Sequence, residues 1–320
     1  MIRTWLQQLR IQLLLAALLV AAWVWIIQPT TATQWIFFLV MIITTGVPHG
    51  SLDFYVEQSQ AALQHTNFSV LRFFFRYLLN MFVYAIIWFW MPSIALLIFI
   101  FLTAYHFGQI DWPFHRPGRL NPILFTLQGL FFIVFIITIQ IQETAPVLEM
   151  LTRDTLPAGF WQQNGSVFAT ISLVGLSVLI VLVPIYQYSQ GIVPTLIAGW
   201  LLQTIFWCIF LYKMPLYIGF AFYFGCWHSL LSFDLIRQQL NLPSSSAGWG
   251  ELMRKALPFS LVALGGIAGL VYFFSAKWQM SNSMGYIFMG IAILTLPHLQ
   301  VFSRLVQFVS ANPSSKKIKE

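Results

Sequence analysis

Four histidines lie within long apolar segments of this 320-residue chain, where few other side chains can carry a proton or bind a metal. They stand in VPHGSLDFY (His49), AYHFGQIDW (His106), GCWHSLLSFD (His228) and LTLPHLQVF (His298). Ionisable side chains inside a membrane are costly and usually serve a function. Imidazole is the commonest metal ligand in proteins. The set therefore predicts a metal site without thiolates, which suits iron, copper or zinc with an open coordination position.

Acidic residues follow three of these histidines. Asp53 stands four residues after His49, which on a helix places both on one face, so Asp53 is expected to hold the other N–H of that imidazole or to bind the metal directly. Asp111 and Asp234 are expected to be solvated acids at helix ends. Backbone carbonyls are expected to open toward a cavity beside the helix-breaking residues that flank His49 and His298, which are Gly46, Pro48, Gly50 and Pro297.

Other interpretations of the four histidines remain open. Each imidazole can simply hydrogen-bond a neighbouring helix and hold a bundle together. Two pairs can ligate haem in a membrane redox subunit, which can also bind quinone. A chain of histidines can relay protons through a transporter or channel.

Aromatic residues make up 17% of the chain, and most are expected to contact lipid or to lie at the membrane interface. A minority are expected to line a tunnel for a long, flat, apolar substrate. The candidates closest in sequence to the histidines are Tyr105, Trp112, Tyr217, Phe222, Tyr223 and Trp227.

The elements that position these residues must be membrane helices. Hydrophobic residues make up 59% of the chain and charged residues only 8%, against roughly 25% charged in soluble domains. The net charge of +7 is scattered at the ends of apolar segments, so it predicts membrane topology and no nucleic-acid binding. Cys208 and Cys226 both fall in apolar segments and suggest neither a disulfide framework nor a cysteine zinc site.

We expect an all-α, polytopic helix bundle over residues 1–310 that contains the metal site, followed by a basic cytoplasmic tail over 311–320. The first apolar segment is long and is expected to remain as a helix rather than to be cleaved as a signal peptide. About ten transmembrane helices are expected, although eight with two re-entrant segments would also fit. The expected spans are 11–28, 34–56, 69–90, 92–110, 122–141, 166–188, 192–212, 214–233, 257–275 and 284–306.

Basic residues predict the orientation of the bundle, because they favour the cytoplasmic side of a membrane. With both termini inside, the outer side receives three of the sixteen, Arg153, Lys213 and Lys277. The inner side receives the other thirteen, which are Arg3, Arg10, Arg72, Arg76, Arg116, Arg119, Arg237, Arg254, Lys255, Arg304, Lys316, Lys317 and Lys319. In this arrangement all four histidines lie in the inner half of the membrane.

Four short motifs, PHGSLD, YHFGQID, GCWHS and LPH, resemble the histidine motifs of the Brp/Blh family of membrane β-carotene 15,15'-dioxygenases, in the same order along most of the chain. The resemblance implies that His49, His106, His228 and His298 bind iron(II). It also implies that O₂ cleaves the central double bond of β-carotene into two all-trans retinal molecules, in the cell (inner) membrane, for delivery to a rhodopsin. Because a carotenoid dissolves only in the bilayer, we expect a lateral entrance between helices.

The third motif departs from the family pattern. Family members often continue as WHSPRH or WHTPRH, whereas this chain has WHSLLSF. The departure puts the choice of carotenoid in question more than the metal.

Overall fold

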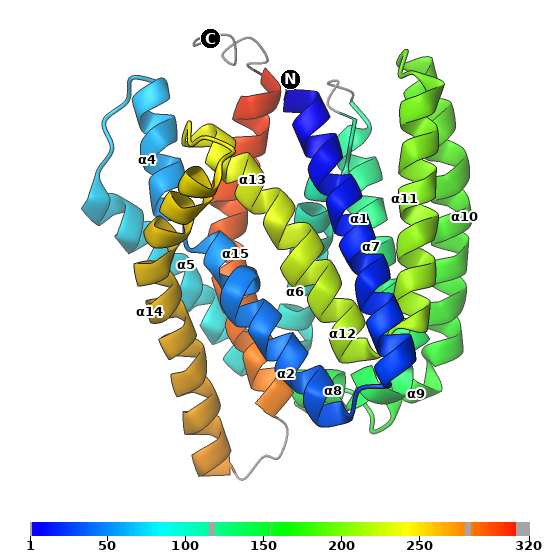
Figure 1. The fold of residues 1–320 in the computed structure, drawn as a ribbon. Coiled ribbons are helices and arrows are strands. Elements are labelled where there is room, and N and C mark those ends of the chain that lie inside the picture. Colours follow the sequence, from blue (N-terminus) through cyan, green and yellow to red (C-terminus); the bar gives the residue numbers. More distant parts are fainter. Residues whose placement is uncertain (1, 115–118, 154, 279–282, 312–320) are drawn as a thin grey trace.

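The computed structural model describes residues 2–114, 119–153, 155–278 and 283–311, and within them the chain is an all-α bundle (Figure 1). Ten helices in this part of the chain are long and apolar enough to cross a membrane, as predicted. The helices are α1 (Ile2–Ile27), α2 (Thr31–Met41), η1 (Ile42–Gly46), α3 (Val47–Gly50), α4 (Asp53–Leu63), α5 (Val70–Trp90), α6 (Pro92–Asp111), α7 (Asn121–Ile139), α8 (Ile141–Thr152), α9 (Phe160–Gln163), α10 (Gly165–Ser189), α11 (Pro194–Lys213), α12 (Leu216–Ala221), η2 (Phe222–His228), α13 (Ser229–Gln239), α14 (Ser246–Trp278) and α15 (Ser283–Ala311).

Several predicted spans differ from the observed helices at their ends, and one differs in its interior. The first span was expected from residue 11, but α1 begins at Ile2, and the eighth was expected to end at residue 233, but α13 continues to Gln239. The ninth span was expected from residue 257, but α14 begins at Ser246. In its polar first turns, Leu252 and Ala256 are buried and Glu251 pairs with Lys255, so this part of the helix is amphipathic. A prediction based on purely apolar runs therefore does not include it. The second span is interrupted, because the π-helical segment η1 and a turn at residues 51–52 divide it into α2, α3 and α4.

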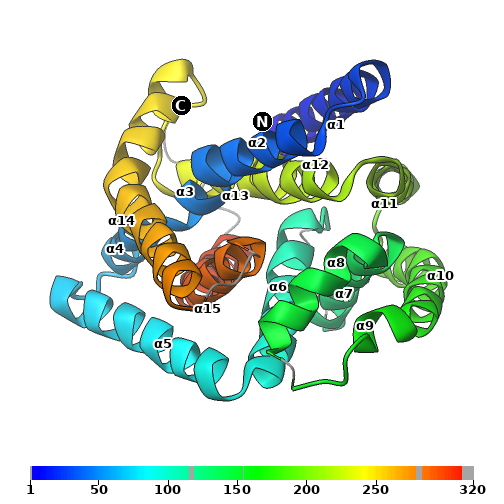
Figure 2. The same ribbon diagram turned by 90° about the horizontal axis from the view of Figure 1, so that it is seen from below.

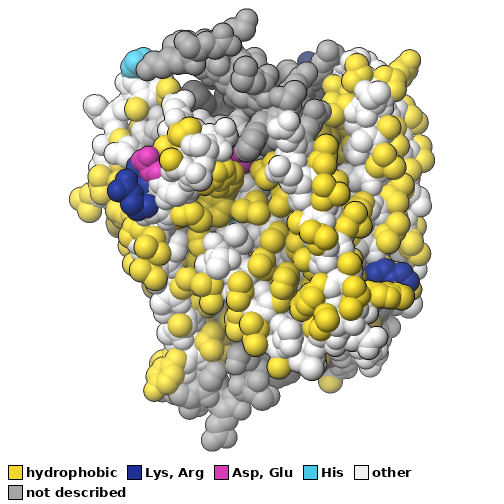
Figure 3. Space-filling model, viewed as in Figure 1, with side chains coloured by type: hydrophobic (Ala, Val, Ile, Leu, Met, Phe, Trp, Pro, Cys, Tyr) yellow, Lys and Arg dark blue, Asp and Glu magenta, His cyan; other side chains and the backbone are white. Residues whose placement is uncertain are grey.

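Helix α15 lies inside the bundle, surrounded by α2 and α3, α5, α6 and α14 (Figure 2). Among the described spans, α15 and the continuous α12–η2–α13 helix are the most buried, whereas α14 and α5 are the least. The outward-facing surface between the two ends of the bundle is largely hydrophobic in the view of Figure 3. This pattern matches a protein whose solvent is lipid.

Helix α1 begins and α15 ends at the same end of the bundle (Figure 1). An even number of spans requires this arrangement, while the cytoplasmic orientation of that end remains a prediction. The expected basic tail over 311–320 and Arg116 lie outside the described residues, except for Ala311 at the end of α15.

Candidate metal centre

The structure brings the four predicted histidines together from four separate segments of the chain. His49 comes from α3, His106 from α6, His228 from the end of η2 and His298 from α15. All four side chains are buried. The centre of the His49 ring lies 4.9 Å from that of His298, 5.4 Å from that of His228 and 6.4 Å from that of His106, which itself lies 4.6 Å from His228 and 4.9 Å from His298.

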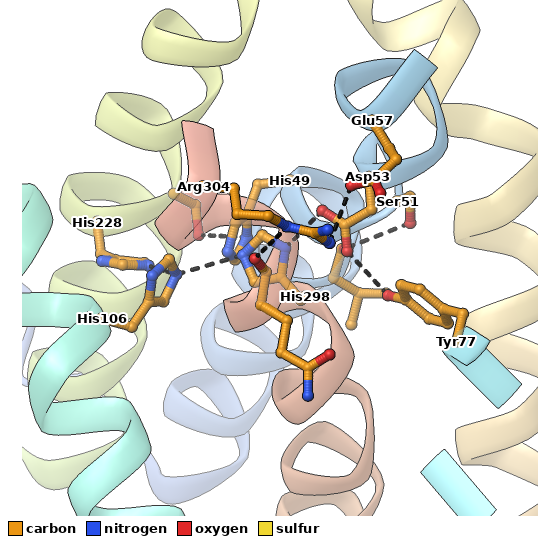
Figure 4. A network of polar contacts seen from close by, with 12 residues as sticks. His49, Ser51, Asp53, Glu57, Tyr77, His106, His228, His298 and Arg304 are labelled. Carbon is orange, nitrogen blue, oxygen red and sulfur yellow. Dashed lines mark hydrogen bonds and ion pairs between the residues drawn. The ribbon is translucent and has the colours of Figure 1, made fainter. Parts of the chain in front are cut away.

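The ring nitrogens have the spacing of ligands around one ion (Figure 4). The Nε2 atom of His106 lies 3.1 Å from Nε2 of His228 and 3.3 Å from Nε2 of His298. Two imidazole nitrogens bound to one ion at about 2.0–2.1 Å are roughly 3.0–3.4 Å apart. One ligand nitrogen from each of His49, His106 and His298 also fits within a 4.8 Å cluster. The donor set therefore fits a divalent metal. The cluster consists of His49, His106 and His298, and His228 lies next to it through its contact with His106.

Asp53 orients His298 rather than His49. Its Oδ1 lies 2.8 Å from Nδ1 of His298, and its Oδ2 accepts a hydrogen bond of 2.9 Å from the Tyr77 hydroxyl. The expected pairing of Asp53 with His49 is wrong, because the chain turns at residues 51–52 and the two residues do not share one continuous helix. A carboxylate that holds Nδ1–H leaves Nε2 of His298 free for a metal.

Ser229 performs the same task for His49. Its Oγ lies 3.2 Å from Nδ1 of His49 and donates at 2.8 Å to the carbonyl of Phe224. Since the hydroxyl has one proton and gives it to that carbonyl, Oγ accepts from Nδ1–H of His49. The Nε2 atom of His49 is then unprotonated and available as a ligand. Nδ1 of His106 and of His228 has no hydrogen-bond partner among the described residues.

Two π-helical segments aim these ligands. One, η1, immediately precedes α3 and His49, and the other, η2, ends at His228. π-Helical turns insert residues into a helix and often occur at functional sites. Pro48 contributes to this irregularity beside His49, because proline has no N–H to donate to a carbonyl of the preceding turn. In η2 the Phe224 carbonyl accepts both the backbone N–H and the hydroxyl of Ser229.

The other acidic residues near the site differ from expectation in their burial. Asp111 and Asp234 were expected to be solvated, but both are buried. The carboxylate of Asp111 accepts hydrogen bonds from the Tyr223 hydroxyl and from Nε1 of Trp227. Asp234 pairs with Arg237 at 2.7 Å. The Asp111 contacts join α6 to η2, whereas the pair of Asp234 and Arg237 lies within α13.

Glu57 lies one helical turn beyond Asp53 on α4, between the site and the end of the bundle, where it forms ion pairs. Its carboxylate forms an ion pair with Arg76 of α5 at 3.1 Å. It forms a second ion pair with Arg304 of α15 at 2.9 Å, and Figure 4 labels both Glu57 and Arg304. The three charges therefore tie α4, α5 and α15 together beside the pair formed by Asp53 and His298.

A cavity of about 510 Å³ adjoins the metal centre. His49, His106 and His298 line it, together with Asp53 and Tyr77. The remaining lining is mostly apolar, and none of the described lining residues is a lysine or an arginine. Aromatic rings near the histidines include Phe107, Phe220, Phe224 and Phe288. An apolar pocket with a few convergent polar groups is the usual form of a small-molecule site.

Of the six aromatic residues predicted to contact substrate, Tyr217 lines this cavity and the other five do not. Tyr105 packs on Phe125, facing α7 instead. The rings of Tyr223 and Trp227 both pack on Trp207 of α11. Trp112 packs against Phe114 and Trp200, and Phe222 against Trp207 and Phe210. Proximity in sequence to a histidine does not fix the helix face, which explains these differences.

The residues that depart from the family motif lie away from the cavity. Leu230, Leu231 and Ser232 replace the Pro-Arg-His portion, and none of them lines it. Ser232 is buried and donates to the backbone carbonyl of His228. The departure therefore changes the packing behind His228, not the surface that faces the cavity.

Comparison with known proteins agrees with this geometry. The sequence model of the beta-carotene 15,15'-dioxygenase family matches residues 40–306, a range that contains all four histidines. A curated relative, the beta-carotene 15,15'-dioxygenase of the uncultured marine bacterium 66A03, is 27% identical over 286 residues, which cover 88% of this chain and 95% of the relative. No solved structure matches the chain.

Proposed function

The chain belongs to the beta-carotene 15,15'-dioxygenase family of carotenoid-cleaving enzymes, and from this membership and the histidine cluster we propose its reaction and its cofactor. It cleaves the central double bond of β-carotene with O₂, at one iron(II) held by His49, His106, His228 and His298, and yields two molecules of all-trans retinal. The observation that carries the proposal is the approach of Nε2 of His106 to Nε2 of His228 at 3.1 Å and to Nε2 of His298 at 3.3 Å, within a cluster that also contains His49 and beside an apolar cavity.

Iron(II) held by neutral histidines would supply an open coordination position at which O₂ is activated. The chain supplies the geometry. Asp53 and Ser229 hold the Nδ1–H groups of His298 and His49, which keeps both Nε2 atoms aimed at one point. The apolar lining excludes water and places the polyene beside the rings of His49 and His106.

Two other interpretations fit the site less well, haem ligation because of the nitrogen spacing and a proton relay because of the apolar lining of the cavity. Two histidines on opposite faces of a haem would hold their nitrogens about 4 Å apart, twice a metal–nitrogen bond, with the macrocycle between their rings. Nε2 atoms at 3.1 and 3.3 Å leave no room for it. A proton relay would need a polar path away from the histidines. The cavity beyond His106 is instead lined by apolar residues such as Phe99, Ile136 and Ile137.

Expression in a bacterium that makes β-carotene tests the reaction. We expect loss of orange colour and formation of retinal, which chromatography measures, and about one iron per chain after purification. The variant H106Q should lose both product and iron. H65Q is the matched control, because His65 is exposed in the loop between α4 and α5. Unchanged pigment with well-expressed, folded protein would refute the proposal.

The cell membrane is the proposed location, with both termini in the cytoplasm. Transfer of the retinal to a rhodopsin in the same membrane remains a prediction from the family.

A further inference from the structure

The cavity beside the candidate metal centre reaches the lipid-facing surface of the described bundle between α5 and α14. Two of its lining residues, Leu78 of α5 and Val262 of α14, are 58% and 75% exposed. A residue that both lines a cavity and is largely exposed marks its mouth. Gly266, one helical turn after Val262 on the same face of α14, is also exposed and also lines the cavity.

The two helices at this mouth are the least buried spans of the described bundle. In the view along the bundle, both lie outside α15, with α14 along its left and α5 below it (Figure 2). Toward the end that carries Glu57, the rings of Phe54, Phe74 and Phe259 close the gap, with ring centres 5.6–6.0 Å apart. Below these rings the back wall is α15, through Leu294 and Gly290, which line the cavity one and two turns before His298.

On the proposed function, we infer that this mouth is the lateral portal through which β-carotene passes between the bilayer and the metal centre. The occupant follows from the chemistry of the path. Both rims lie within membrane spans, and the wall from Val262 to His298 is apolar. A charged or water-soluble ligand would lose its hydration there without a partner, whereas a polyene exchanges lipid contacts for similar ones.

Gly266 is the position that keeps the portal wide. A Cβ atom added at Gly266 would meet no heavy atom within 4 Å, so the space directly beside the backbone is open. The neighbouring glycine, Gly265, is also exposed, and a Cβ atom added there would also meet no heavy atom within 4 Å. Unlike Gly266, it does not line the cavity. The two glycines therefore form a matched pair, since a large residue should fold equally well at either position.

The test compares G266F with G265F, both as full-length protein in liposomes that contain β-carotene. We expect G266F to lower kcat/KM for retinal formation by roughly tenfold or more, a difference of about 1.4 kcal/mol in the barrier. G265F should act as wild type does. Iron content and thermal unfolding should be the same in both variants, because neither residue contacts a histidine.

The opposite rim gives a second, independent pair. L78W adds bulk at the mouth, whereas L79W places the same ring on an exposed position of α5 that does not line the cavity. Equal kcat/KM within both pairs, with active wild-type enzyme, would overturn the portal while leaving the proposed function intact. Absence of retinal from the wild-type enzyme with iron bound would instead refute the proposed function.

Discussion

Asp53 makes two hydrogen bonds with different consequences for the metal centre. It orients the ring of His298 through Nδ1 and is itself fixed by the Tyr77 hydroxyl. On the proposed function, we expect D53N to weaken the binding of iron by about 10–100-fold, the usual cost of losing such a partner of a metal ligand. Y77F, which removes only the outer hydrogen bond, should have a smaller effect. Iron titration of the purified apoprotein measures both. Equal affinity in D53N and wild type would contradict this role.

Ser229 gives a sharper test of the tautomer of His49. S229A removes the acceptor for Nδ1–H, so Nδ1 and Nε2 of His49 compete for the proton and iron affinity should fall. S232A is the matched control, because Ser232 is equally buried on α13 and, like Ser229, donates to a backbone carbonyl, but it does not accept a hydrogen bond from the His49 ring. Iron titration should separate the two variants. The assignment fails if S232A weakens binding as much as S229A does.

The four histidines could be selected from the sequence because an imidazole in an apolar run is expensive and therefore conspicuous. Tyr77 and Ser229 could not be selected in this way. Hydroxyl residues are common in membrane helices, and their partners Asp53 and His49 lie 24 and 180 residues away in the chain. Only the packing of α5 and α13 against α4 and α3 reveals the contacts.

At the scale of helices, Asp111 joins three elements behind His106 and His228. Its carboxylate binds Tyr223 and Trp227 of η2, while Arg10 of α1 donates to the carbonyls of Ile110 and Asp111. We expect D111N to destabilise the folded protein by about 1–3 kcal/mol, because buried donors lose a charged acceptor. Thermal unfolding in detergent measures the loss.

Y223F is the graded control for that variant. It removes one donor and leaves the Trp227 hydrogen bond of 2.7 Å in place, so its unfolding temperature should lie between those of wild type and D111N. Wild-type stability in D111N would show that the cluster does not hold α6 against η2.

The helices themselves were largely predictable, and their irregularities were not. Twenty-residue apolar runs bounded by proline and glycine mark spans whatever their neighbours are. The segment η1 (IITTG) consists of β-branched residues and a glycine, and η2 (FYFGCWH) is mostly aromatic, but the α-helical spans of this chain contain the same residue types. A π-helical turn differs from an α-helical one by a single inserted residue. The turn at residues 51–52 likewise separates Asp53 from the helix of His49, which periodicity alone did not indicate.

At the scale of the whole molecule, composition predicted the class of fold but not its interior. A chain with 8% charged residues must place helices in lipid. Which helix lies at the centre depends on packing. Helix α15 is surrounded and α14 is peripheral, although the apolar windows of both are long and hydrophobic. The cavity follows from this arrangement, since it lies against the α15 face that carries Leu294 and His298.

The orientation of the bundle in the membrane is the last prediction, and it decides where the site lies. Thirteen of sixteen basic residues fall on the side expected to be cytoplasmic, so the loop between α4 and α5 should face the cytoplasm and α8 the outer side. Single cysteines at the exposed positions Thr66 and Gln142, introduced as T66C and Q142C after C208A and C226A, test this. A membrane-impermeant maleimide on intact cells should label Q142C alone.

Labelling of T66C alone would show that the bundle has the opposite orientation in the membrane, with the same fold. The orientation decides the depth of the site in the membrane. Arg304 follows His298 by six residues, or about 9 Å along α15. In the expected orientation the histidines therefore lie close beneath the cytoplasmic face, and cleavage takes place in the inner half of the bilayer. The portal between α5 and α14 then opens mainly toward the membrane interior below the aromatic closure of Phe54, Phe74 and Phe259.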